Sequence, residues 1–181
     1  MEKNNTPTRL LTRKITMAAM TIAVSLLVSS VFRNTSSILS AIIVPIILSI
    51  FLSSFTIKEY TFVSFTLLFL TLILITTQTV FMSLYILHGQ TLIFLFLKSK
   101  PNKRMHYFYY LILVSLSLFI GILLTELIFN IPLHLFMMNL AKNNYLIYAA
   151  IILFEGLLIS SFHVFLILRV HKSLVNSRYF Q

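Results

Sequence analysis

Six long apolar segments follow one another along this chain, separated by short polar stretches. They begin at the following positions: Ile15, Ser37, Tyr60, Val80, Tyr107 and Asn143. Each is close to the roughly 20 apolar residues that a helix needs to cross a hydrocarbon core about 30 Å thick. The pattern therefore predicts an all-α integral membrane protein with six transmembrane helices.

The polar stretches predict where the chain is divided. Residues 1–14 are polar and basic and should form a mobile arm, residues 15–170 form the six-helix membrane domain, and residues 171–181 form a tail.

Pro45 is expected to kink the second helix, because proline lacks the amide hydrogen of a regular helix. The connection over residues 130–144 mixes apolar and polar residues, as a lid or a half-inserted loop would. Three tyrosines are expected to anchor the fifth helix at the membrane interface: Tyr107, Tyr109 and Tyr110.

Charge adds an orientation to this topology. The chain has 181 residues, 59% of them hydrophobic and 10% charged, so little polar surface remains for a soluble domain. Of its 14 Lys and Arg, only Arg33 and Lys142 fall in segments predicted to lie outside when the N-terminus is inside. Cationic loops resist translocation, so both termini are expected in the cytoplasm, with the chain in the plasma membrane. The bilayer, rather than nucleic acid, explains the net charge of +10.

Several chemistries lack their residues. The chain has no cysteine and no aspartate, and its three glycines, at 89, 121 and 156, form neither a nucleotide-binding P-loop nor a G-x-S-x-G elbow. No H-E-x-x-H motif occurs. We therefore expect no enzymatic activity, no cofactor and no metal site.

One carboxyl group lies deep in a predicted span. Glu155 is roughly eleven residues from the outer end of the sixth helix, which at about 1.5 Å per residue places it near the middle of the membrane. A charge at that depth is costly, so such a residue is by default a candidate for contact with a substrate, a proton or a partner. The alternatives are a protonated carboxylic acid or a structural pair with His88. Gly156 beside it would admit the close approach of a ligand or a helix.

Further polar residues gather on the predicted outer side and could line an outward-opening pocket. With Glu155 they form the predicted substrate-binding set: Tyr148, Glu126, Asn144, Tyr85, Gln78 and His88. Each of them alone is more often a satisfied interfacial residue than a ligand contact. His163, eight residues after Glu155, is expected to make a structural hydrogen bond.

Two small residues mark the first helix. Ala19 and Ala23, at positions i and i+4, lie on one helical face, where small side chains let another helix approach closely. This face could pack within the bundle, or it could dock a partner subunit from the cytoplasmic side.

The segments 11–23 (LTRKITMAAMTIA) and 154–158 (FEGLL), together with the six-span topology, resemble the substrate-binding S components of energy-coupling factor (ECF) transporters. The resemblance implies that Ala19 and Ala23 dock on a transmembrane coupling subunit, and that separate subunits hydrolyse ATP. It also implies capture of a small micronutrient, a vitamin or its precursor, in an outer-half pocket. Arg33 and Lys142 mildly favour an anionic or neutral polar ligand.

Two other classes compete with this reading. A non-catalytic membrane scaffold of cell-envelope synthesis would need no small-molecule pocket, and would use the Ala19/Ala23 face for another protein. A small intramembrane enzyme would need Glu126, Glu155 and the histidines to converge on one centre.

Overall fold

Helices make up all the regular structure in the computed structural model, which describes residues 7–32, 37–98 and 103–176. Their order and bounds are as follows: α1 (Pro7–Val31), α2 (Ser37–Phe51), α3 (Ile57–Leu74), η1 (Thr76–Gln78), α4 (Thr79–Leu92), the π-helical turn η2 (Ile93–Lys98), α5 (Lys103–Phe129), α6 (Leu133–Leu140) and α7 (Tyr145–Asn176).

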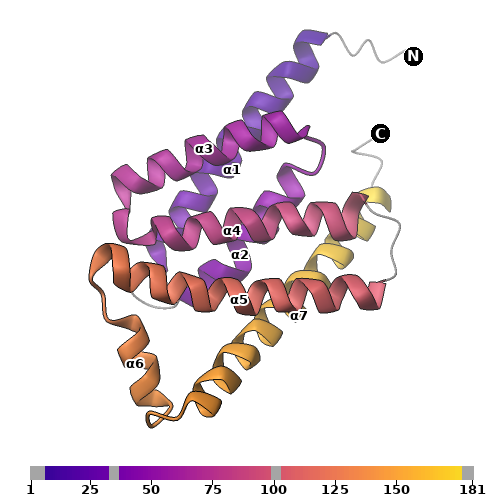
Figure 1. Ribbon diagram of the computed structural model, residues 1–181. Coiled ribbons are helices and arrows are strands. Elements are labelled where there is room, and N and C mark those ends of the chain that lie inside the picture. The colour runs from indigo at the N-terminus through magenta and orange to yellow at the C-terminus, as the bar shows by residue number, and fades with distance from the viewer. Residues whose placement is uncertain (1–6, 33–36, 99–102, 177–181) are drawn as a thin grey trace.

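The turns and ends of the helices lie at two opposite ends of the bundle (Figure 1). At one end lie the first turns of α1, the α2–α3 turn, the last turn of η2 and the last turns of α7. We call this the basic end, because it carries Lys14, Lys58, Lys98, Arg104 and Arg169. At the opposite end lie η1, which joins α3 to α4, and the short helix α6. We call this the hairpin end.

Five helices are long and apolar enough to cross a membrane, as in a multi-pass membrane protein. The exception among the six predicted spans is α2, whose 15 residues extend only about 22 Å. It lies at the centre of the bundle, in contact with α1, α4 and α7. Since other helices surround it, much of its surface faces protein rather than lipid, and its length need not match the hydrocarbon core.

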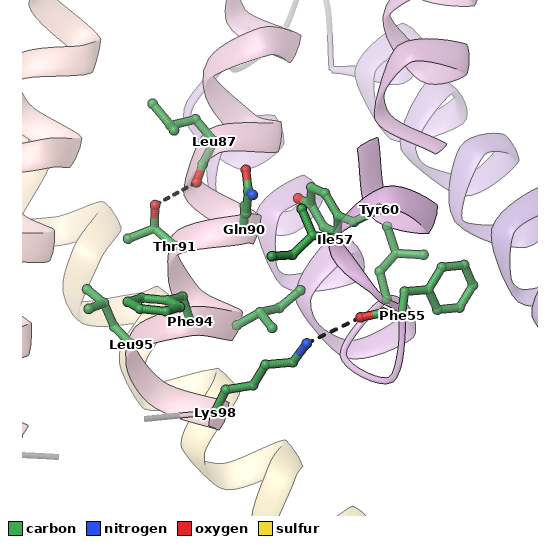
Figure 2. Close-up of a pocket in the computed structure, with 11 residues that line it drawn as sticks. Phe55, Ile57, Tyr60, Leu87, Gln90, Thr91, Phe94, Leu95 and Lys98 are labelled. Atoms are coloured by element: carbon green, nitrogen blue, oxygen red, sulfur yellow. Dashed lines mark hydrogen bonds between the residues drawn. The ribbon is translucent and has the colours of Figure 1, made fainter. Parts of the chain in front are cut away.

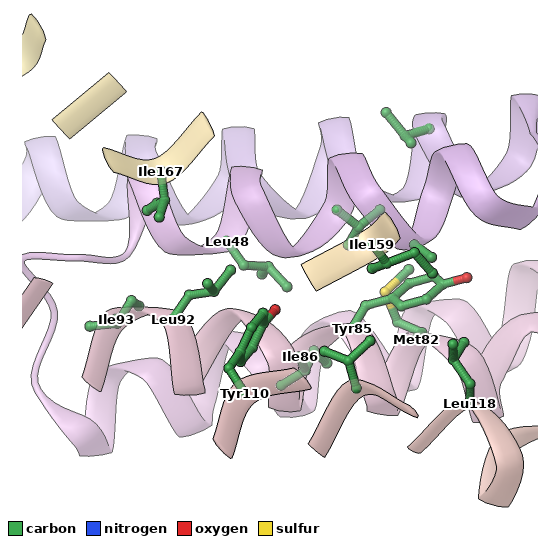
Figure 3. Packing of buried hydrophobic residues seen from close by; sticks show 14 of the residues in the cluster. Leu48, Met82, Tyr85, Ile86, Leu92, Ile93, Tyr110, Leu118, Ile159 and Ile167 are labelled. Carbon is green, nitrogen blue, oxygen red and sulfur yellow. The ribbon is translucent and has the colours of Figure 1, made fainter. Parts of the chain in front are cut away.

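The core forms where α2, α4, α5 and α7 face one another, as Figure 3 shows. Gly89 lets α2 and α4 approach closely, because a Cβ at this position would lie 2.9 Å from the Leu48 Cβ and 3.3 Å from the Pro45 carbonyl oxygen. The Ser49 hydroxyl contacts the carbonyl oxygens of both Pro45, at 2.6 Å, and Gly89, at 3.1 Å. The two helices are therefore in close contact, through hydrogen bonds as well as apolar side chains.

Helix α1 begins at Pro7, earlier than the predicted start at residue 15. Proline is well tolerated in a first helical turn, where its missing amide hydrogen would have no partner, so residues 7–14 extend the helix instead of forming a mobile arm. At the other end of the chain, α7 continues to Asn176, into the predicted tail. The rest of the predicted arm and tail, 1–6 and 177–181, lies outside the described residues.

The predicted connection over residues 130–144 contains the short helix α6. Left-handed backbone at Asn130 (φ 57°) turns the chain out of α5, and Lys142 (φ 52°) and Asn143 (φ 56°) turn it into α7. Asparagine tolerates this conformation better than most residues. These turns lay α6 across the hairpin end, between α5 and α7 (Figure 1).

Candidate functional site

A cavity of about 210 Å³ lies beneath α6 at the hairpin end. Five helices contribute its walls, which we call the α6 cavity: Ile38 and Ala41 from α2, Phe81 and Tyr85 from α4, Leu118 and Ile122 from α5, Leu133, Phe136 and Met137 from α6, and Glu155 and Ile159 from α7. Two of these side chains are polar, Tyr85 and Glu155. The cavity is therefore a small apolar space with one carboxyl and one phenol.

The position of Glu155 depends on its neighbour. A Cβ at Gly156 would collide with the Ser115 side chain and would lie 3.1 Å from the Ser115 Cα, so α7 and α5 touch at this level. The sequence left open whether a ligand or a helix comes close to Gly156. In the structure it is helix α5, through Ser115. This contact fixes the rotation of α7 about its axis and directs the half-buried Glu155 toward the α6 cavity.

Hydrogen bonds tie α6 to the helices on both sides of it. The His134 amide, in the first turn of α6, donates to the Glu126 carboxylate of α5 at 3.1 Å. The His134 Nδ1 lies 3.3 Å from the Tyr148 hydroxyl of α7. Glu126 thereby satisfies a helix N-terminus, where a negative charge is favourable. Glu126 and Tyr148 thus hold the cover of the cavity and do not line it.

The remaining predicted substrate-binding residues lie elsewhere. The Asn144 side chain accepts from the amides of Leu146 (2.9 Å) and Ile147 (3.3 Å) and so caps α7. Gln78 belongs to η1 and is not part of the cavity wall. Both side chains lie at the hairpin end of the bundle, where helices begin or end.

His88 is buried in the core, away from the α6 cavity. Its Nε2 lies 2.6 Å from the Ser117 hydroxyl, which donates to the Val114 carbonyl, so the histidine is the donor to Ser117. The structural pair of His88 with Glu155, one of the sequence-based alternatives, is not formed. Among the residues that the structure describes, the one ion pair joins Lys14 and Glu59 at 2.7 Å.

Tyr110 corrects a second expectation, since it is fully buried rather than an interfacial anchor. Its hydroxyl donates to the His163 Nδ1 at 2.6 Å. The His163 Nε2 contacts two carbonyl oxygens, of Ala41 (2.9 Å) and Ile42 (3.1 Å), and must carry the hydrogen because carbonyls only accept. The structural hydrogen bond expected of His163 is confirmed, and it links α2, α5 and α7.

The face of α1 that carries Ala19 and Ala23 lies on the outside of the bundle. Ala19 and Ala23 are both exposed, so this face does not pack within the chain. The face that does pack carries three other small residues at four-residue spacing, all buried: Thr21, Ser25 and Ser29. Ala18 and Ala19 line a groove of about 510 Å³ between α1 and α3, with the Lys14–Glu59 ion pair at its basic end.

A second pocket, of about 460 Å³, opens between the α2–α3 turn and α4 at the basic end. Figure 2 shows Lys98 reaching from η2 to the Phe55 carbonyl, to which it donates at 3.2 Å. Most of its wall is apolar. None of the seven predicted substrate-binding residues lines this pocket.

Sequence reasoning missed most of the α6 cavity wall. Phe81, Phe136 and Leu133 are apolar residues in apolar surroundings, and their sequence carries no signal that separates a cavity wall from a lipid-facing surface. The convergence that an intramembrane enzyme would need is not found within the described ranges. His88 and His163 lie together in the core, with ring centroids 6.2 Å apart, whereas Glu126 binds the His134 amide and Glu155 lines the α6 cavity. In the same ranges no three His, Cys, Asp or Glu side chains group in a way that could hold a metal ion.

Comparison with known proteins finds no matching family model, no matching curated protein and no matching solved structure.

Proposed function

We propose that this protein is the substrate-binding subunit of an ECF-type importer and captures a small micronutrient at the outer face of the plasma membrane. The observation that carries the proposal is the α6 cavity. It brings Glu155 and Tyr85, two residues singled out by their polarity within apolar segments, into the wall of one small cavity. A carboxyl and a phenol among apolar walls are typical of small-molecule sites, where few polar groups fix the orientation of the ligand.

The charge distribution supports the orientation that this function requires. The basic end carries Lys14, Lys58, Lys98, Arg104 and Arg169, and cations concentrate on the cytoplasmic side of membrane proteins. The hairpin end would then face outward, with α6 over the cavity mouth. In this arrangement six membrane passages, with α2 as the short central one, return the chain to the cytoplasmic side.

The exposed face of α1 supports docking on a coupling subunit. Ala19 and Ala23 leave a shallow surface on which another transmembrane helix could pack closely. The sequence has no P-loop, so the energy for release of the substrate would come from separate ATPase subunits. The proposed partners are therefore a transmembrane coupling subunit and ATPases, in addition to the substrate and the bilayer.

Native mass spectrometry of the protein purified in a mild detergent tests the capture function. We expect one small molecule bound per chain, and loss of that molecule in Leu133→Trp, which fills the α6 cavity. Leu135→Trp is the matched control, because Leu135 lies on the same helix but is exposed and outside the cavity. A folded protein that carries no small molecule, and whose thermal unfolding no vitamin or precursor shifts, would contradict the proposal.

The second candidate is a scaffold protein of cell-envelope synthesis. The exposed Ala19/Ala23 face and the adjoining groove between α1 and α3 favour it as much as they favour an importer, because both functions need a membrane partner. The two functions differ at the α6 cavity. A scaffold would tolerate Leu133→Trp without loss of function.

A further inference from the structure

We infer that the ligand of the α6 cavity is a small organic cation, an amine or a quaternary ammonium compound with an apolar body. This inference rests on the proposed capture function and adds the chemical class of the substrate. It reverses the expectation of an anionic or neutral ligand, which considered only the cations Arg33 and Lys142.

The charge of the cavity wall is the first argument. Among the residues that the structure describes, Glu155 is the one carboxyl group in the wall, and no described Lys, Arg or His lines it. The ion pair found among the described residues, Lys14–Glu59, lies at the basic end of the bundle. A carboxylate at membrane depth is costly unless a positive charge accompanies it. A bound cation would supply that charge from outside the protein.

The aromatic residues are the second argument. Phe81 and Tyr85 lie one helical turn apart on α4, with ring centroids 6.5 Å apart, and Phe136 approaches from α6. Aromatic faces attract alkylammonium groups through the negative charge of the ring face. A carboxylate with several aromatic rings in one small cavity therefore suits a cation better than an anion or a neutral sugar-like ligand.

The size of the cavity limits the ligand. A volume of about 210 Å³ is below the roughly 300–1,000 Å³ usual for drug-sized ligands. The ligand should thus be about the size of a single substituted ring. Its entry is favoured by the charge distribution, because the described cations Lys14, Lys58, Lys98, Arg104 and Arg169 lie at the basic end and not at the cavity.

Binding of matched probes to the full-length protein in detergent tests this inference. The cationic probes are benzylamine and benzyltrimethylammonium, and the neutral and anionic probes of similar size are benzyl alcohol and benzoate. We expect the two cations to raise the unfolding temperature and to bind in a saturable way by calorimetry, while the other two have no effect. Glu155→Gln should weaken cation binding at least tenfold.

Glu59→Gln is the control, because Glu59 carries the same charge but lies at the basic end, where it pairs with Lys14 instead of lining the cavity. It should leave cation binding unchanged. Equal binding of charged and neutral probes, or undiminished cation binding by Glu155→Gln, would overturn the inference. A neutral or anionic compound bound in the cavity would overturn the cation class alone and leave the capture function standing. The absence of any bound small molecule, with no response to any probe, would overturn both.

Discussion

His163 donates a hydrogen bond to the carbonyl oxygen of Ala41, across 122 residues of sequence and at 2.9 Å. In a regular helix this carbonyl would accept from the amide of residue 45, but Pro45 has no amide hydrogen. The histidine thus supplies the donor that the proline removes. This replacement matters in a membrane, where no water is present to satisfy a backbone carbonyl.

The first prediction concerns the coupling between these two sites. His163→Leu should lower the free energy of unfolding by about 1–3 kcal/mol, because it leaves the Ala41 carbonyl unsatisfied. In a Pro45→Ala background the same change should cost clearly less, since the backbone amide restored by that substitution can donate to Ala41. Denaturant unfolding in detergent for the four proteins of this cycle provides the measurement. An equal cost of His163→Leu in both backgrounds would show that the histidine does not replace the lost amide.

The second prediction concerns the contact of α5 with α7. Gly156→Ala should lower the free energy of unfolding by about 1–3 kcal/mol, because the new Cβ meets both the side chain and the backbone of Ser115. Thermal unfolding in detergent measures the effect. Gly121→Ala is the control, since its Cβ would approach the end of the flexible Leu84 side chain at 2.6 Å, which can move, and the Phe81 ring at 3.4 Å, an ordinary contact distance. A larger loss for Gly121→Ala than for Gly156→Ala would contradict the tight α5–α7 contact.

The third prediction concerns orientation. The chain has no cysteine, so a single introduced cysteine reports its own position without background. With a membrane-impermeant maleimide on intact cells, we expect Thr76→Cys and Asn139→Cys, exposed at the hairpin end, to be labelled. Ser54→Cys, exposed at the basic end, should be labelled only after permeabilisation. The opposite pattern would place the basic end outside the cell and exclude capture from the outer face through the α6 cavity.

The fourth prediction concerns the exposed face of α1. Ala19→Leu and Ala23→Leu should leave the unfolding temperature nearly unchanged, because both residues are exposed. They should nevertheless reduce co-purification with a membrane partner, because the added side chains prevent the close approach of helices. Ala150→Leu, the same change at an exposed position of α7, is the control and should keep the partner. If the α1 variants retain a partner as well as the control does, the docking surface lies elsewhere.

The sequence alone predicted the helices and the distribution of charge along them. Long apolar runs and the polar breaks between them located the long helices, and the break between the segments that begin at Tyr60 and Val80 falls at η1. These features are local, because the length of an apolar run decides whether it can cross a membrane. Glu155 could also be recognised from the sequence alone, since a carboxyl group within an apolar run is costly and therefore marks a candidate functional residue.

The tertiary structure decided which polar residues meet. Among the predicted substrate-binding residues, Glu155 and Tyr85 share a cavity, His88 is buried in the core, and Asn144 caps a helix. The hydrogen bond between Tyr110 and His163 could not be predicted from the sequence either. The reason is physical: lipid is as apolar as a protein core, so the helices of this chain are apolar on every side and no hydrophobic stripe marks the buried face. Only packing sets the rotation of each helix, and that rotation determines which polar groups face one another.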